Sequence, residues 1–187
     1  MASAPGFNPN SYADYSDASW KLAAITDQFE PGSTFKLVSL AAMLDTGFKT
    51  ETDKVFCENG AWHVMGETIE DTKRYANLSV RDVLVYSSNI GMAKLGREFD
   101  RQNMYAYAEK FGFGQVSGIE LDGEISGVLK SIRDWTGFTP LVFAFGHEVA
   151  VTALQMTCMF STIANDGVYV SPRLLLGISN HGEYGYP

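Results

Sequence analysis

Apolar residues recur at helical spacing in several stretches of this chain, whereas alternating, strand-like patterns are few and short. Residues 33–44 are almost wholly apolar and are followed by Gly47, which predicts a helix that ends there. Further helices are predicted over residues 90–99 and 102–111. The chain is therefore predicted to be rich in helix.

Two capping boxes mark further helix starts. Ser79-Val-Arg-Asp82 predicts a short helix that runs to about Tyr86. Thr152-Ala-Leu-Gln155 predicts another, in which apolar residues continue at helical spacing until Asn165-Asp166-Gly167 ends it.

The remaining segments have no sustained period. Residues 1–30 are predicted to be irregular and residues 48–76 to be loop with short strands. Residues 115–150 are rich in glycine and are predicted to be mostly loop, and residues 168–187 to be short extended segments and turns. A length of 187 residues suits one domain.

Composition narrows the function classes. The formal net charge of -8 argues against a nucleic-acid partner. The sequence contains no run of 18 apolar residues, so no membrane span is predicted. The first residues have no signal-peptide pattern, which indicates either a cytoplasmic chain or a natural N-terminus that lies elsewhere. The spacing of Cys57 and Cys158 fits neither a metal site nor a redox motif; Cys158 is interpreted as a core residue, with a disulfide as the minor alternative.

The apolar helix over residues 33–44 contains one ionisable side chain, Lys36. A helix that is apolar all round is normally buried, and burial lowers the pKa of a lysine. Ser33 lies three residues earlier on the same face, where a lysine of lowered pKa can take the proton of the hydroxyl. Ser33 also falls in the first turn, where free backbone N–H groups favour a developing oxyanion.

A second polar motif, Ser87-Ser88-Asn89, interrupts the helical pattern. From a loop between helices it can face a cleft opposite Ser33 and Lys36, with Ser87 relaying a proton and Asn89 holding a substrate amide. Each motif alone also fits a simpler interpretation: Ser33 as an N-cap with Lys36 reaching solvent, and Ser87–Asn89 as a capped helix break.

The residues around both motifs carry a family resemblance. Ser-x-x-Lys with Ser-x-Asn and Lys-Thr-Gly is the motif set of β-lactamases and penicillin-binding proteins. Ile25-Thr-Asp-Gln-Phe-Glu-Pro-Gly-Ser-Thr-Phe-Lys36 closely resembles the first motif of class B penicillin-binding proteins, and Ser87-Ser-Asn-Ile-Gly91 resembles their second. Further segments follow the order of the family: residues 1–10, 111–114, 118–124, 151–155 and 164–167. Among them, the Phe-Gly-Phe-Gly run of residues 111–114 and the Gly-Glu pattern resemble the division-type, FtsI-like branch more than the elongation branch.

The resemblance implies an α/β (α+β) transpeptidase fold of the penicillin-binding-protein and β-lactamase type. Residues 1–187 would hold mainly its helical portion, with most of the central antiparallel sheet missing. A membrane anchor, a pedestal domain and the Lys-Thr-Gly region would lie outside the chain, because none of its lysines precedes Thr-Gly or Ser-Gly. We therefore expect the isolated chain to be inactive and its helices to expose apolar faces, most of all the helix of Ser33.

The resemblance also implies D,D-transpeptidation of peptidoglycan in septal cell-wall synthesis. Ser33 would attack the D-Ala–D-Ala bond of a stem peptide, with Lys36 as general base and Ser87 and Asn89 completing the cleft; β-lactams would acylate Ser33. No metal or organic cofactor is implied. The expected partners are the stem peptide, β-lactam antibiotics, a SEDS-family glycosyltransferase and divisome proteins, met on the outer side of the cytoplasmic membrane.

Two other functions stay open. A serine β-lactamase has the same fold, although no Glu-x-x-Leu-Asn-type segment follows the second motif here. A truncated or decayed penicillin-binding domain without turnover is favoured by the missing Lys-Thr-Gly. Phe145-Gly146-His147-Glu148 departs from the family; His147 is interpreted as a surface or supporting residue, with substrate contact as the weaker alternative and no metal site expected.

Overall fold

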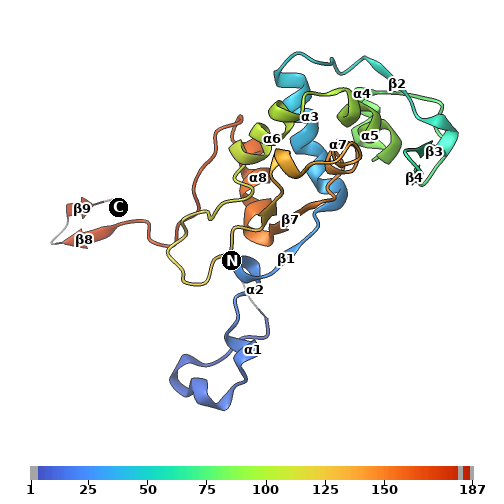
Figure 1. Cartoon of the computed structure of the whole chain (residues 1–187). Helices are drawn as coiled ribbons and strands as arrows, with labels where there is room; N and C mark the ends of the chain where they lie inside the picture. The colour runs from blue at the N-terminus through green and yellow to red at the C-terminus, as the bar shows by residue number, and fades with distance from the viewer. Residues whose placement is uncertain (1–3, 181–182, 186–187) are drawn as a thin grey trace.

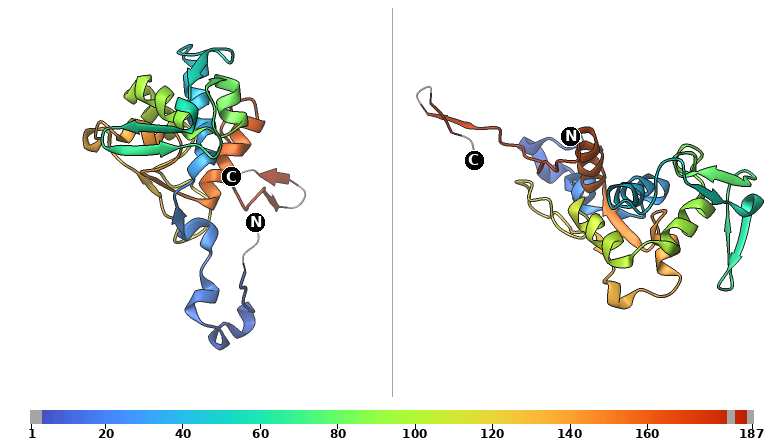
Figure 2. Two further views of the ribbon diagram at one scale, coloured as in Figure 1. Left: turned by 90° about the vertical axis from the view of Figure 1, so that its right-hand side faces the viewer. Right: turned by 90° about the horizontal axis from the view of Figure 1, so that it is seen from above.

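The computed structural model describes residues 4–180 and 183–185. A body of packed helices occupies its centre, and two segments extend away from it (Figure 1, Figure 2). One is the N-terminal segment around helix α1 (Asp17–Trp20), and the other is the hairpin of β8 (Ile178–Asn180) and β9 (Glu183–Gly185).

The remaining elements are short, and few exceed ten residues. The other α-helices are α2 (Ala23–Thr26), α3 (Lys36–Asp45), α4 (Val80–Val85), α5 (Asn89–Glu98), α6 (Arg101–Lys110), α7 (Thr139–Phe143) and α8 (Ala153–Ala164). The 3-10 turns are η1 (Pro9–Asp14), η2 (Gly32–Phe35), η3 (Glu58–Gly60) and η4 (Ile132–Asp134). The other strands are β1 (Gln28–Phe29), β2 (Lys54–Phe56), β3 (Ala61–Val64), β4 (Glu67–Glu70), β5 (Asn77–Ser79), β6 (Val128–Leu129) and β7 (Val149–Thr152).

Every strand pairing in the described residues is antiparallel. The largest sheet has the order β1-β7-β6, with Phe29 opposite Val151 and Leu129 opposite Val149. Strands β2 and β5 form a second pair, and β3 and β4 form a hairpin. Because β1 ends just before η2, its pairing with β7 places the segment that contains Ser33 beside the segment that precedes β7.

Helix α3 lies in the middle of the helical body (Figure 1). Its apolar composition is explained by burial on most sides, and the packing begins in η2, where Phe35 is fully buried. The Phe35 ring contacts Phe143 edge-on, with centroids 5.1 Å apart, and Phe113 at 5.3 Å. The predicted helix over residues 33–44 is thus confirmed, except that its first turn is of the 3-10 type.

Helices α5 and α7 pack closely because of one glycine. A Cβ on Gly96 would lie 2.5 Å from both the Ala144 Cβ and the Pro140 carbonyl oxygen. Helix α7 falls in the segment predicted to be mostly loop. That prediction missed α7 because a five-residue helix is too short to show a period.

Both predicted helix starts are confirmed at their caps. The Ser79 hydroxyl accepts from the Asp82 N–H, and Thr152 and Gln155 form a complete capping box at α8. Residues 1–30, predicted to be irregular, hold the short elements η1, α1, α2 and β1. Residues 181–182 and 186–187, within the predicted extended C-terminal segment, lie outside the described residues.

The two cysteines are free and buried, so the disulfide alternative is wrong and the core interpretation of Cys158 is confirmed. Burial raises the pKa of both thiols, Cys57 and Cys158. Both side chains therefore behave as small apolar core groups.

An apolar groove of about 380 Å³ lies between α3, α4 and α8. The exposed large side chains that line it are Leu44 on α3, Leu84 and Val85 on α4, and Ile163 on α8. The expectation that the helix of Ser33 would be the most exposed is wrong, because α3 is covered by its neighbours on most sides and leaves one such residue. Within the described ranges, no helix is long and apolar enough to cross a membrane.

Candidate active site

Ser33 lies in η2, at the surface, directly before the buried start of α3. Gly32 has φ +54° and donates its N–H to the Gly146 carbonyl at 3.1 Å. The Thr34 hydroxyl donates to the Pro31 carbonyl at 2.7 Å, and the Ser33 carbonyl accepts the Lys36 N–H. The turn is therefore held from both ends while the Ser33 side chain stays accessible.

The segment before β7 packs against this turn. A Cβ on Gly146 would lie 2.1 Å from the Gly32 oxygen, so only glycine allows the two backbones to approach so closely. The Glu30 carboxylate accepts hydrogen bonds from His147 Nδ1 at 2.8 Å and from the Glu148 N–H at 3.1 Å. The interpretation of His147 as a surface, supporting residue agrees with this contact, and its hydrogen bond is the main reason that the pKa of Glu30 is lowered.

Lys36 is fully buried and points its amino group at the second motif. Lys36 Nζ donates to the Ser87 carbonyl at 2.6 Å, to Ser87 Oγ at 3.0 Å and to Asn89 Oδ1 at 2.8 Å. Burial lowers the pKa of Lys36 to about 8, against the attraction of the Asp71 carboxylate, which raises it. At pH 7 about a tenth of the Lys36 amino group is thus unprotonated, which is the form that a general base requires.

The three acceptors match the three hydrogens of an ammonium group. After Lys36 loses a proton, two hydrogens and one lone pair remain. The Ser87 carbonyl and Asn89 Oδ1 can only accept, so they take the two hydrogens and the lone pair faces a third direction, where a hydroxyl can donate to it. Ser87 Oγ is one such hydroxyl, and it can reverse its bond and donate to Lys36 Nζ.

The structure brings Lys36, Ser87 and Asn89 together and places Ser33 one helical turn before Lys36. In the part of the chain that the structure describes, none of the hydrogen bonds of Lys36 Nζ goes to Ser33 Oγ. Catalytic hydrogen bonds are often long before substrate binds, so this geometry is compatible with a nucleophile and its base.

Residues 70–71, which the sequence did not single out, support the second motif. Ser87 adopts φ +55° between α4 and α5, and the buried Ser88 caps α5 by accepting the Gly91 N–H at 2.9 Å. The Ser88 hydroxyl donates to Asp71 Oδ2 at 2.6 Å, and Asn89 Nδ2 donates to the Glu70 carbonyl at 3.1 Å. No local pattern links Asp71 to Ser88, because the two lie 17 residues apart.

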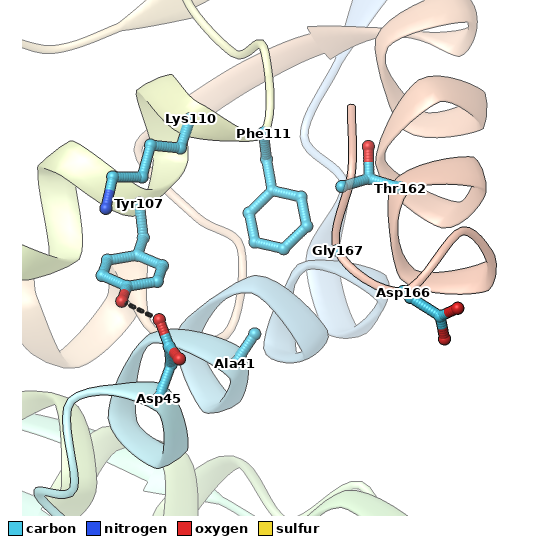
Figure 3. Close-up of a pocket in the computed structure, with 8 residues that line it drawn as sticks. All are labelled: Ala41, Asp45, Tyr107, Lys110, Phe111, Thr162, Asp166 and Gly167. Atoms are coloured by element: carbon cyan, nitrogen blue, oxygen red, sulfur yellow. Dashed lines mark hydrogen bonds between the residues drawn. The ribbon is translucent and has the colours of Figure 1, made fainter. Parts of the chain in front are cut away.

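A hollow of about 360 Å³ lies at the other end of α3 from Ser33 (Figure 3). Tyr107 donates a hydrogen bond to Asp45 there, and the Lys110 ammonium lies 4.4 Å from the centre of the Tyr107 ring. These polar groups are already paired with each other, and no nucleophile with a base lines the hollow. The candidate site is therefore the surface around Ser33, and no cluster of metal-binding side chains is found among the described residues.

The sequence profile described as the penicillin binding protein transpeptidase domain matches residues 1–184. The chain belongs to this family. The predicted resemblance to FtsI-like class B penicillin-binding proteins is confirmed by relatives that match most of the transpeptidase-family chain.

Two curated relatives illustrate the match. The probable peptidoglycan D,D-transpeptidase PbpC of Pseudomonas aeruginosa is 33% identical over 175 residues, which cover 94% of this chain and 31% of the relative. The peptidoglycan D,D-transpeptidase FtsI of Escherichia coli is 31% identical over 169 residues, which cover 90% of this chain and 28% of the relative. The chain thus spans about a third or less of the length of these relatives.

The predicted fold is confirmed by solved structures. Penicillin-binding protein 3 of Mycobacterium tuberculosis, in complex with aztreonam, superposes with a TM-score of 0.79 at 31% identity, over 88% of this chain and 37% of that chain. The helices and small sheets of this transpeptidase-family chain are therefore part of the penicillin-binding-protein fold.

Proposed function

We propose that the chain forms part of a peptidoglycan D,D-transpeptidase that is acylated on Ser33. The observation that carries the proposal is the fully buried Lys36, bonded to Ser87 and Asn89 one turn after an exposed serine. The names of the relatives, which are peptidoglycan D,D-transpeptidases, support the reaction class.

In acylation, Ser33 Oγ attacks the carbonyl carbon between the two D-alanines of a stem peptide. Its proton passes to the unprotonated Lys36 Nζ as the carbon–oxygen bond forms. The carbon–nitrogen bond then breaks, and the leaving amine of the terminal D-Ala takes a proton that Lys36 supplies through the Ser87 hydroxyl. The products are an ester on Ser33 and free D-Ala.

In deacylation, an amine of a neighbouring stem peptide attacks the ester carbon. Its proton passes to Lys36, the ester carbon–oxygen bond breaks, and Ser33 Oγ regains a proton. The result is a new peptide cross-link and an unchanged enzyme, so no cofactor enters the balance.

Asn89 has a free donor for substrate. An amide NH₂ group carries two hydrogens, and the Glu70 carbonyl accepts one of those on Asn89 Nδ2. The second hydrogen remains available for a substrate carbonyl, while Asn89 Oδ1 orients Lys36. Asn89 thus links the position of the base to the position of the substrate.

β-Lactams would acylate Ser33 by the same steps, because their strained amide stands in for the D-Ala–D-Ala bond. Related structures of penicillin-binding protein 3 contain aztreonam and ampicillin, which supports this part of the proposal. We also propose that the complete protein is anchored in the cell membrane, acts outside it in septal wall synthesis, and works with a SEDS-family glycosyltransferase and divisome proteins, as the class B resemblance implies.

The test is covalent labelling of the full-length protein by a fluorescent penicillin. We expect Ser33→Ala to abolish the label and Ser161→Ala, an exposed serine on α8, to leave it unchanged. Label that survives in Ser33→Ala would refute the nucleophile.

A second measurement separates the competing functions. Release of D-Ala together with cross-linked product supports the transpeptidase. Labelling without D-Ala release would instead indicate a binding domain without turnover, and hydrolysis of the penicillin ester within seconds would indicate a β-lactamase.

A further inference from the structure

The Asp71 carboxylate is joined to the start of α5 by three hydrogen bonds. Asp71 Oδ1 accepts from the Asn89 N–H at 2.5 Å and from the Ile90 N–H at 3.1 Å, and Oδ2 accepts from the Ser88 hydroxyl at 2.6 Å. The acylation steps proposed above give this carboxylate no part.

These bonds satisfy groups that a helix leaves open. The first N–H groups of an α-helix have no partner within the helix. Asp71 takes those of Asn89 and Ile90, and the Ser88 hydroxyl takes that of Gly91. Ser88 and Ile90 are buried, so removal of the carboxylate would leave buried donors without a protein partner, which is costly.

The same contacts fix the groups that surround Lys36. Asn89 is held through its backbone by Asp71 and through its amide by the Glu70 carbonyl, which leaves Asn89 Oδ1 directed at Lys36 Nζ. Ser87 directly precedes the anchored Ser88, and both its carbonyl and its hydroxyl accept from Lys36 Nζ. A shift of α5 at its first turn would therefore move all three acceptors of the Lys36 amino group.

We propose that Asp71 is a positioning residue of the transpeptidase site, which fixes Ser87 and Asn89 around Lys36 and supplies the negative charge that faces its amino group. The catalytic consequence of this inference rests on the proposed function, whereas the hydrogen bonds of Asp71 are independent of it.

The charges around Lys36 are consistent with the electrostatic part of this role, in which the Asp71 carboxylate acts on the Lys36 amino group. Its direct partners, Ser87 and Asn89, are neutral. Asp71 attracts the protonated form of Lys36 and opposes the lowering of its pKa by burial. The Cys57 thiol, whose pKa burial raises, lies 3.5 Å from Ser88 Oγ, and Lys94 is paired with Glu58. Removal of the Asp71 charge should therefore lower the pKa of Lys36.

The variant that isolates the charge is Asp71→Asn in the full-length protein. Asparagine has the same shape, and its oxygen can still accept from Asn89 and Ile90, while its NH₂ can donate to Ser88 Oγ. The matched control is Asp100→Asn, which removes a carboxylate from the N-cap of α6, where the Asp100 side chain accepts the Asn103 N–H at 2.9 Å. Asparagine caps as well as aspartate, so both variants should fold, which melting temperatures verify.

The first measurement is the rate of acylation by a fluorescent penicillin against pH. We expect the rising limb of Asp71→Asn to move to lower pH by about half a unit or more, because a less stabilised ammonium loses its proton earlier. Asp71→Ala, which removes the hydrogen bonds as well, should lower the plateau by about tenfold to a hundredfold. Asp100→Asn should match the wild type. If the role of Asp71 were purely structural, its substitution would change the maximal acylation rate without shifting the pH at which that rate rises.

The second measurement does not need activity. Titration of the lysine 13Cε resonances by NMR reports the pKa of Lys36 directly, and it should fall in Asp71→Asn and not in Asp100→Asn. An unchanged Lys36 pKa, or an unchanged plateau in folded Asp71→Ala, would overturn the inference. If instead the pKa falls but the wild type is not labelled on Ser33, the proposed function fails while the electrostatic role of Asp71 stands.

Discussion

Lys36 Nζ lies 2.8 Å from Asn89 Oδ1, although 53 residues separate them in the chain. This contact joins the first turn of α3 to the first turn of α5, and each turn carries one of the two sequence motifs. A buried ammonium needs such acceptors, because an unpaired buried charge is strongly destabilising. The fold therefore stabilises Lys36 with the same groups that we propose for catalysis.

The proposed role of Lys36 as a base gives the first prediction. Acylation by a penicillin should rise with pH around the Lys36 pKa of about 8, because only the unprotonated amine can take the Ser33 proton. Lys36→Arg keeps a cation that does not lose its proton, so acylation should fall by about 10²- to 10⁴-fold at every accessible pH. Stopped-flow acylation kinetics would measure both effects.

Lys130→Arg is the control for the first prediction, because the half-buried Lys130 pairs with Glu148 and not with the motifs. It should retain the wild-type pH profile. A Lys36→Arg protein that is folded and acylated at the wild-type rate would exclude Lys36 as the base.

The depressed pKa of Lys36 also predicts a dependence of stability on pH. Folded Lys36 loses its proton near pH 8, whereas the unfolded lysine holds it to about 10.5. Between these values the unfolded state binds more protons, so the unfolding free energy rises with pH. Relative to Lys36→Met, the wild type should gain about 2 kcal/mol between about pH 7 and about pH 10.

Urea unfolding of both proteins at each pH would measure this difference. All other titratable groups are shared by the two proteins, so their contributions cancel. A difference in unfolding free energy that stays constant with pH would show that Lys36 keeps its ordinary pKa in the folded protein.

Local signals explain what could be predicted from the sequence. The isolation of Lys36 in an apolar run marked a buried helix, and the caps at Ser79 and Thr152 marked two helix starts. These features depend on residues within one or two turns, so a window of sequence contains them. The meeting of Lys36 with Ser87 and Asn89 was expected from the family resemblance rather than from either motif alone.

Long-range contacts between short segments explain what could not be predicted. The bonds of Asp71 to Ser88 and Asn89 join a loop to a helix start, and the close approach of Gly146 to Gly32 joins two turns more than a hundred residues apart in the printed sequence. Strands of two to four residues, such as β1 and β7, are too short for an alternating pattern. The supports of the candidate site therefore depend on tertiary structure that no local pattern reports.

The capping box of α8 gives a prediction about stability. Thr152 is fully buried, its hydroxyl accepts the Gln155 N–H at 3.1 Å, and Gln155 Oε1 accepts the Thr152 N–H at 2.9 Å. Thr152→Ala should lower the unfolding free energy by about 1 to 2 kcal/mol, because it leaves the Gln155 N–H without a partner. Thr157→Ala makes the same chemical change at an exposed position of α8 and should be neutral or slightly stabilising, since alanine is the better helix former. Equal losses in the two variants by urea unfolding would contradict the capping role.

The contact of Gly146 with Gly32 predicts a loss of both stability and acylation in Gly146→Ala. Gly146 has φ +89°, and an added Cβ would lie 2.1 Å from the Gly32 oxygen, so the turn that carries Ser33 must move. Gly118→Ala is the matched control, because Gly118 has φ +80° with no atom within 4 Å of an added Cβ. The control should lose about 1 kcal/mol from backbone strain, whereas Gly146→Ala should lose about 1 to 3 kcal/mol more from the clash.

Urea unfolding and penicillin acylation should be measured on the same samples of both variants. The acylation rate of Gly146→Ala should fall even where the protein remains folded, because Gly32 donates to the Gly146 carbonyl directly before Ser33, the proposed nucleophile. Equal effects of the two substitutions would show that the turn of Ser33 does not depend on this close approach.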